Sequence, residues 1–140
     1  MAEIYQIGSG MIGQAMALDL AKNNKIHLAD LKIENVRKEI KDHPAIITYD
    51  LDVLNKKKLS SFIKKADIVL LAIPGYLGYS ALKTIISSGK NVVDISFSPE
   101  NLMGLNDIAL ENDVTAIFDA GVAPGLPNYI FGYYDSIEKI

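Results

Sequence analysis

The residues whose types and spacing best predict chemistry form a glycine loop, Gly8–Gly13, of sequence GSGMIG. The loop directly follows an apolar segment, Glu3–Ile7, that is typical of a strand, and it opens a predicted helix. Gly8 would permit the tight turn, Gly10 would let a pyrophosphate approach the backbone, and Gly13 would let the helix pack closely on the sheet. The free N–H groups and the positive end of the helix dipole favour phosphate. The loop therefore predicts a dinucleotide site.

An acid closes the second predicted strand, where such a site places one. Asp30 follows Gly13 by 17 residues, close to the spacing of a carboxylate that accepts hydrogen bonds from the adenosine ribose. Its oxygens match a 2′-hydroxyl, whereas they would repel a 2′-phosphate. Lys32 softens this preference, but no arginine follows Asp30 directly. We therefore expect NAD as the cofactor, with NADP less favoured.

Two other interpretations of the loop and the acid stay open. A glycine turn followed by a helix-capping aspartate would have a structural role only. A methyltransferase also places a glycine loop after its first strand and an acid after its second. The third glycine, Gly13, and the immediate entry into the helix favour the dinucleotide.

Apolar segments alternate with amphipathic stretches along the chain, which predicts an α/β fold. We expect a doubly wound parallel Rossmann sheet of about six strands in the order 3-2-1-4-5-6, with helices on both faces. The strands are expected at Glu3–Ile7, Lys25–Ala29, Ala45–Tyr49, Ile68–Leu71, Asn91–Ile95 and Thr115–Phe118. The helices are expected at Met11–Lys22, Ile33–Lys41, Lys56–Lys65, Gly78–Ser88 and Pro99–Asn112, the last with Ser98 as N-cap and Pro99 as its first residue.

The character of the chain changes after Phe118, where a Gly/Pro-rich loop leads into an aromatic segment, Tyr129–Ile140. A helix in this segment either packs back on the sheet or exposes an apolar surface that a further domain covers. We favour the second arrangement. Residues 1–120 then form the dinucleotide-binding domain, and residues 121–140 form a loop and the start of a substrate domain that is largely absent from this chain.

Composition and charge exclude several classes of function. The 140 residues carry a formal net charge of −3, too weak and mixed for a nucleic-acid surface. The absence of cysteine excludes disulfides, a thiolate nucleophile and sulfur-ligated zinc, and no other metal site is predicted. No signal peptide is visible, and the longest apolar run, Ile68–Pro74, is far too short to span a bilayer. We expect a cytoplasmic protein without a nucleic-acid or membrane partner, and a homodimer stays open.

Further candidate residues follow the other strands, because ligands of open α/β sheets bind outside the carboxyl ends of the strands. Asp52 follows the third strand, where it either frames the adenine or caps a turn. Ile73–Tyr76 follows the fourth strand and Ser96–Ser98 the fifth, nearer the reacting ring. His27, inside a strand, and His43, beside a proline, are poor candidates for a general base. No catalytic residue is assigned.

Several motifs together resemble the saccharopine dehydrogenase family. Besides the glycine loop, they are Ala29-Asp30, Leu51–Val53, Ala66–Val69, Gly89–Asp94 and Asp119–Gly125. The likeness runs over essentially the whole chain, and the last motif, DAGVAPG, is the most specific because few families share it.

The resemblance implies a longer polypeptide, whose second α/β domain completes a site for an amino-acid substrate. Members of the family oxidise or form a C–N bond at an amino acid by hydride transfer with NAD(H) or NADP(H). The resemblance assigns Ser9, Gly10, Met11 and Ile12 to the pyrophosphate, Asp30 to the ribose, Asp52 and Val53 to the adenine, Ile73 and Pro74 to the nicotinamide side, and Phe97 with the Gly121–Gly125 loop, including Pro124, to the substrate side.

One departure from the family pattern bears on the substrate. Saccharopine reductases tend to carry an acid before the Pro-Gly pair, where this chain has Ala123. This difference, together with Asp94 and Phe97, favours a lysine 6-dehydrogenase-like branch. The alternative function is a non-catalytic NAD(H)-binding or redox-sensing module, which would not need the Asp119–Gly125 loop.

Overall fold

One parallel sheet of six strands forms the centre of the protein. The computed structural model describes residues 1–138, and the predicted continuation of the last helix to Ile140 lies outside them. The strand order is β3-β2-β1-β4-β5-β6, which confirms the predicted fold class and order. The strands are β1 (Glu3–Ile7), β2 (Lys25–Asp30), β3 (Ile46–Asp50), β4 (Ile68–Leu71), β5 (Val92–Asp94) and β6 (Ala116–Ile117).

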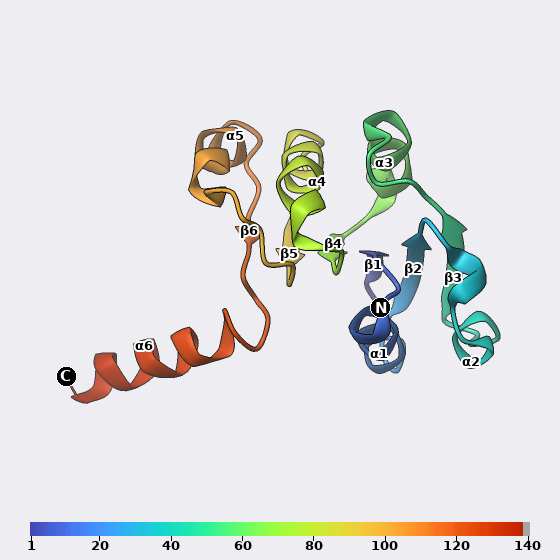
Figure 1. The fold of residues 1–140 in the computed structure, drawn as a ribbon, viewed down its shortest axis with the longest axis horizontal. Helices are drawn as coiled ribbons and strands as arrows, with labels where there is room; N and C mark the ends of the chain where they lie inside the picture. Colours follow the sequence, from blue (N-terminus) through green and yellow to red (C-terminus); the bar gives the residue numbers. More distant parts are fainter. Residues whose placement is uncertain (139–140) are drawn as a thin grey trace.

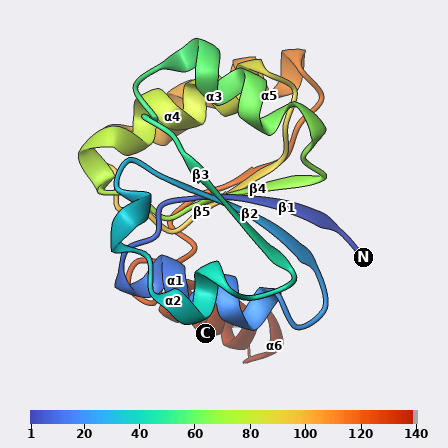
Figure 2. The same cartoon turned by 90° about the vertical axis from the view of Figure 1, so that its right-hand side faces the viewer.

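Helices cover both faces of the sheet, as Figures 1 and 2 show. On one face lie α3 (Lys56–Phe62), α4 (Gly75–Ser87) and α5 (Asn106–Glu111), and on the other lie α1 (Met11–Leu20) and α2 (Lys38–Lys41). Short 3-10 turns η1 (Ile33–Asn35), η2 (Ile63–Lys65) and η3 (Leu102–Leu105) precede α2, follow α3 and precede α5. No helix within residues 1–138 is both long and apolar enough to cross a membrane.

The continuous apolar sequence of β4 follows from burial on both faces of the sheet. Val69 and Leu71 pack in the core under α3 and α4, while Leu70 packs in the core under α1. A strand with helices on each side has no solvated face, so polar alternation is absent from it. The β4 strand therefore lies at the centre of the domain, beside β1.

One predicted helix is interrupted because tertiary contacts hold its middle in an extended conformation. The predicted helix Ile33–Lys41 is broken at Val36 and Arg37, which are extended. Val36 is buried in the core, and the backbone N–H of Arg37 donates to Gln14 Oε1 at 3.1 Å. A continuous helix would give up both contacts.

The predicted cap of the helix that precedes β6 was wrong. Ser98 and Pro99 are not helical, and the hydroxyl of Ser98 donates instead to Glu100 at 2.6 Å. Asn101 caps η3 by accepting the N–H of Met103 at 3.1 Å, so the helical segment begins after it. The helix α4 begins at Gly75, directly after Pro74, which is three residues before the predicted start at Gly78.

The last helix, α6 (Leu126–Glu138), extends away from the sheet and its helical layers (Figure 1). It begins three residues before the predicted Tyr129, and it does not pack back on the sheet. Its exposed apolar side chains are Leu126, Tyr129, Ile130, Phe131, Tyr133 and Tyr134. Within the described residues, this surface has no covering element.

The core under α4 provides a test of the packing. Ile85 is fully buried there, so Ile85→Ala should lower the free energy of unfolding by about 2 to 5 kcal/mol, through lost burial and the cavity left behind. Lys83→Ala, at an exposed position of the same helix, should change it by less than about 0.5 kcal/mol. Urea unfolding measures both values. A small loss for Ile85→Ala would contradict the core described here.

Candidate functional site

A cleft of about 470 Å³ lies at the carboxyl ends of β1, β2, β3 and β4. This is the edge where parallel sheets of this order bind ligands, since the chain leaves β1 and β4 in opposite directions. The cleft brings together predicted cofactor residues from four separate segments: Gly8, Gly10, Asp30, Asp52, Val53, Ile73 and Pro74. Ser9, Met11, Ile12 and Gly13 belong to the same loop and helix start but do not line the cleft.

The glycine loop has the geometry that its sequence predicts. Gly8 has a φ of +100°, and a Cβ there would lie 2.1 Å from the carbonyl oxygen of Ala72. A Cβ on Gly13 would lie 2.4 Å from the carbonyl oxygen of Gly8. At Gly10, by contrast, a Cβ would meet nothing within 4 Å. Two glycines are thus required by the fold itself, whereas Gly10 leaves open space at the start of α1.

The carboxylate of Asp30 connects the end of β2 to the glycine loop. It accepts the backbone N–H of Ser9 at 2.6 Å and that of Lys32 at 2.9 Å. Burial raises the pKa of Asp30, but the N–H donors of Lys32 and Ser9 outweigh burial and bring the pKa below its ordinary value of 3.8. Asp30 is therefore ionised at neutral pH. A carboxylate offers about four acceptor positions, so it has capacity for a ligand hydroxyl.

Asp52 lies on the same cleft and forms a turn. Its Oδ1 accepts the N–H of Leu54 at 2.9 Å, which is the turn that one of the two sequence interpretations predicted. The side chain also lines the cleft beside Val53. Both features coexist at this position.

Phe97, which follows β5, lies close to the cleft because its backbone contacts the segment that follows β4. A Cβ on Gly75 would lie 1.7 Å from the carbonyl oxygen of Phe97, so the backbones of these residues are in direct contact. Pro74, the neighbour of Gly75, lines the cleft. The side chain of Phe97 is 71% exposed. A substrate-side candidate therefore lies beside the predicted nicotinamide end.

The loop that carries Gly121, Pro124 and Gly125 lies at the carboxyl end of β5. The N–H of Ala120 donates to the carbonyl of Asp94 at 3.0 Å, and Gly121 and Gly125 form a bridge that closes the loop on itself. The loop shares the carboxyl edge with the cleft but does not line it. Asp94 beneath it is fully buried, and burial raises its pKa above the ordinary value.

The structure adds residues that sequence reasoning missed. Leu31, Leu54 and Leu77 line the cleft; the first two lie one or two residues beyond predicted site residues, and that adjacency was the available signal. Two glutamines bond to the glycine loop, Gln6 from β1 and Gln14 from α1. The signal for Gln6 was a polar residue inside an apolar strand.

Both histidines have hydrogen-bond partners within the protein. The ring nitrogens of His27 bond to Glu3 at 2.5 Å and to Tyr49 at 2.8 Å, and its ring stacks on Tyr5. The prediction that His27 is a satisfied sheet residue is confirmed. His43 Nδ1 accepts the N–H of Ala45 at 3.2 Å. Across residues 1–138, no three His, Asp or Glu side chains gather as metal ligands do.

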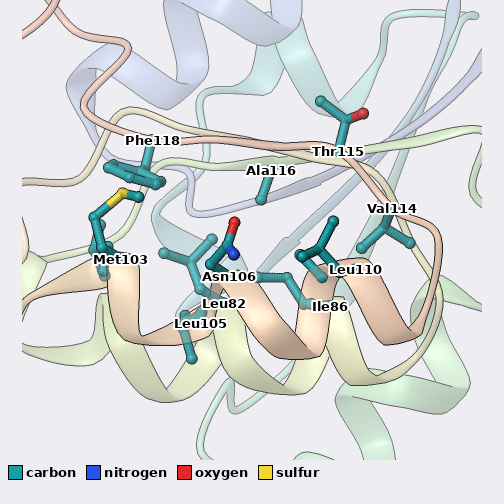
Figure 3. A pocket seen from close by; sticks show the side chains of 12 residues that line it. Leu82, Ile86, Met103, Leu105, Asn106, Leu110, Val114, Thr115, Ala116 and Phe118 are labelled. Atoms are coloured by element: carbon teal, nitrogen blue, oxygen red, sulfur yellow. The ribbon is translucent and has the colours of Figure 1, made fainter.

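A second hollow of about 360 Å³ lies between α4, α5 and β6. Figure 3 shows the side chains of its 12 lining residues. Asn106 and Thr115 are the polar members, and the others are apolar. Because it lacks a glycine turn and a titratable side chain among these 12 residues, it offers no chemistry comparable to that of the first cleft.

The strand order, the glycine turn between β1 and α1, and the acid that ends β2 define a Rossmann-type nucleotide-binding domain. The chain belongs, more particularly, to the family described as "Saccharopine dehydrogenase NADP binding domain", whose model matches residues 4–117. This match confirms the predicted family.

The relatives extend beyond the part that this chain matches. The "Saccharopine dehydrogenase [NADP(+), L-glutamate-forming]" of Pyricularia oryzae is 25% identical over 125 residues, which cover 88% of this chain and 28% of that protein. The apo saccharopine dehydrogenase (L-Glu forming) of Saccharomyces cerevisiae has a TM-score of 0.85 at 22% identity, over 99% of this chain and 32% of that one. Homoserine dehydrogenase of S. aureus has a TM-score of 0.64 at 20% identity, over 86% and 32%. The chain thus spans about a third of the length of these relatives.

The contrast between Gly8 and Gly10 yields a prediction. Gly8→Ala should lower the free energy of unfolding by about 2 kcal/mol or more, because the new Cβ meets the Ala72 carbonyl and φ is positive. Gly10→Ala should change it by only about 0.5 kcal/mol, since its space is open, but should weaken NADH binding at least about tenfold by obstructing the approach of a phosphate. Urea unfolding and NADH fluorescence titration measure the two effects. Unchanged NADH affinity in Gly10→Ala would contradict this assignment of the loop.

Proposed function

We propose that this chain binds a nicotinamide dinucleotide in the cleft at the carboxyl edge and serves as the cofactor domain of an oxidoreductase. The observation that carries the proposal is the open space at Gly10, at the start of α1, with the ionised carboxylate of Asp30 on the same cleft. Backbone N–H groups at the start of a helix favour phosphate. A carboxylate beside them matches the hydroxyls of a ribose.

The residues along the cleft fit the successive parts of such a cofactor. Gly10 and the start of α1, with Ser9, Met11 and Ile12, would hold the pyrophosphate, and Asp30 would hold the adenosine ribose. Asp52 and Val53 would border the adenine. Ile73 and Pro74 would border the nicotinamide, which supplies hydride transfer when the cofactor is bound.

Asp30 supports NAD rather than NADP as the preferred cofactor. An ionised carboxylate close to the ribose attracts a 2′-hydroxyl donor and repels a 2′-phosphate. The matching family and the Pyricularia relative carry NADP in their descriptions, so the preference is a specific property proposed for this chain. Lys32, on the same cleft, is the cation that would soften it.

We further propose that residues 1–120 form the cofactor domain and that residues 121–140 lead into a substrate domain in a longer chain. The apolar surface of α6 supports this division, because such a surface is usually covered. The substrate would be an amino acid, with hydride transfer at its C–N bond. Ala123, Phe97 and Asp94 favour a lysine 6-dehydrogenase-like reaction over saccharopine reduction. A cytoplasmic location fits the cysteine-free composition.

The cofactor preference is testable at Asp30. The chain should bind NADH about tenfold more tightly than NADPH, and Asp30→Asn should reduce this ratio to about twofold by removing the charge that repels the 2′-phosphate. Asp52→Asn, on the same cleft, should leave the ratio unchanged. Fluorescence titration with both nucleotides measures it. Equal affinities in the unaltered chain would overturn the preference for NAD.

The activity is testable by comparing this chain with the complete coding sequence. The 140-residue chain should show no turnover of NAD with lysine or saccharopine. A product extended by roughly 200 residues of α/β pattern, a usual domain size, should form NADH with an amino-acid substrate. Absorbance at the NADH band follows both reactions. A complete coding sequence that ends at residue 140 would instead support a binding module.

A further inference from the structure

The peptide group between Gly8 and Ser9 is held at both of its ends by side chains. Its carbonyl oxygen accepts a hydrogen bond from Gln6 Nε2 at 3.1 Å, and its N–H donates to Asp30 Oδ2 at 2.6 Å. The next carbonyl, that of Ser9, accepts from Gln14 Nε2 at 2.8 Å. The orientation of two successive peptide planes in the loop is thus set by side chains outside it.

The position of Gln6 is unusual for a polar residue. It is the fourth of the five residues of β1, is fully buried, and lies between Leu28 of β2 and Leu70 of β4 in the sheet. Its Nε2 also donates to the carbonyl of Gly13 at 2.6 Å, so one amide joins the start of the loop to the first turn of α1. Its Oε1 is buried and has no hydrogen-bond partner among residues 1–138.

An unpaired buried oxygen costs free energy, which an apolar residue of the same size would avoid. Gln6 is therefore poorly explained by core stability alone. What its amide does provide is a donor for the Gly8 carbonyl in the loop and for the Gly13 carbonyl in the first turn of α1. These two bonds hold the end of β1 against the start of α1, where the free N–H groups of a helix favour an anion.

Gln14, on α1, also bonds to a carbonyl of the glycine loop. While its Nε2 holds the Ser9 carbonyl, its Oε1 accepts from both the backbone N–H and the Nε of Arg37, at 3.1 and 3.2 Å. The carbonyl of Gly10 is taken by the first hydrogen bond of α1, from the N–H of Gln14 at 2.9 Å. Three successive loop carbonyls are engaged, and none of the described residues accepts the N–H of Gly10.

We propose that Gln6 and Gln14 are positioning residues that hold the loop carbonyls away from the cleft and so orient the Gly10 N–H and the start of α1 toward phosphate. This inference rests on the proposed dinucleotide function and adds the residues that prepare the loop before the ligand arrives. Neither glutamine lines the cleft. Both act through the backbone that they hold.

The test replaces the Gln6 amide with an unbranched side chain of similar length. Gln6→Met should weaken binding of NADH and of ADP-ribose about tenfold, but that of adenosine, which lacks phosphates, by less than twofold. Leu28→Met is the matched control, since Leu28 is buried directly opposite Gln6 on β2 and bonds to no loop carbonyl. It should leave ADP-ribose affinity within twofold. Calorimetric titration with ADP-ribose and an NMR titration with adenosine give the affinities.

The outcomes separate this inference from the function on which it rests. If the unaltered chain binds neither NADH nor NADPH, the proposed function fails and the inference with it. If the unaltered chain binds and Gln6→Met binds ADP-ribose equally well, or loses adenosine to the same extent, the inference alone is overturned. Should Gln6→Met not fold, Gln14→Met tests the second amide at a half-buried site. A loss of about threefold or more for ADP-ribose supports the inference, and unchanged affinity overturns it.

Discussion

Gly8 lies so close to the backbone of Ala72 that no side chain fits between them, and the rest of the site depends on this contact. It joins the end of β1 to the end of β4, the two neighbouring strands from which the chain departs in opposite directions. The cleft opens between the segments that follow β1 and β4. A bulkier residue at Gly8 would move the loop, and with it the start of α1 and the bond from Ser9 to Asp30.

Cofactor and substrate candidates lie along one edge because every strand of the sheet runs the same way. The loops after β1, β2, β3 and β4 line the cleft, and the loops after β5 and β6 continue the edge beyond it. The contact of Gly75 with Phe97 and the bond from Ala120 to Asp94 tie the two regions together.

The strands and the glycine loop were predictable because their signals are local. Apolar segments such as Ile68–Leu71, and the loop Gly8–Gly13 with Asp30 after it, can be recognised without knowing what surrounds them. The break in the helix at Val36 could not be predicted in this way, because it depends on a hydrogen bond between Arg37 and Gln14, which are 23 residues apart in the chain.

Other features depended on tertiary contacts in the same way. The roles of Gln6 and Gln14 could not be inferred from residue type, since a glutamine in a strand or helix usually faces water. Ser98 was expected to cap a helix by a general preference, but the residues that directly follow it are not helical, and its hydroxyl bonds to Glu100. The leucines of the cleft carry no chemical signature, and only the fold reveals that they line it.

The pairing of β1 with strands on both sides has a consequence for how the domain assembles. The partner of Ile4 on one side is Ile26, whereas on the other side it is Ile68. Closing the larger loop costs more chain entropy, and contacts of long sequence separation form late. During synthesis, one edge of β1 therefore remains unpaired until β4 has left the ribosome, and the nascent chain carries an apolar strand edge through that interval.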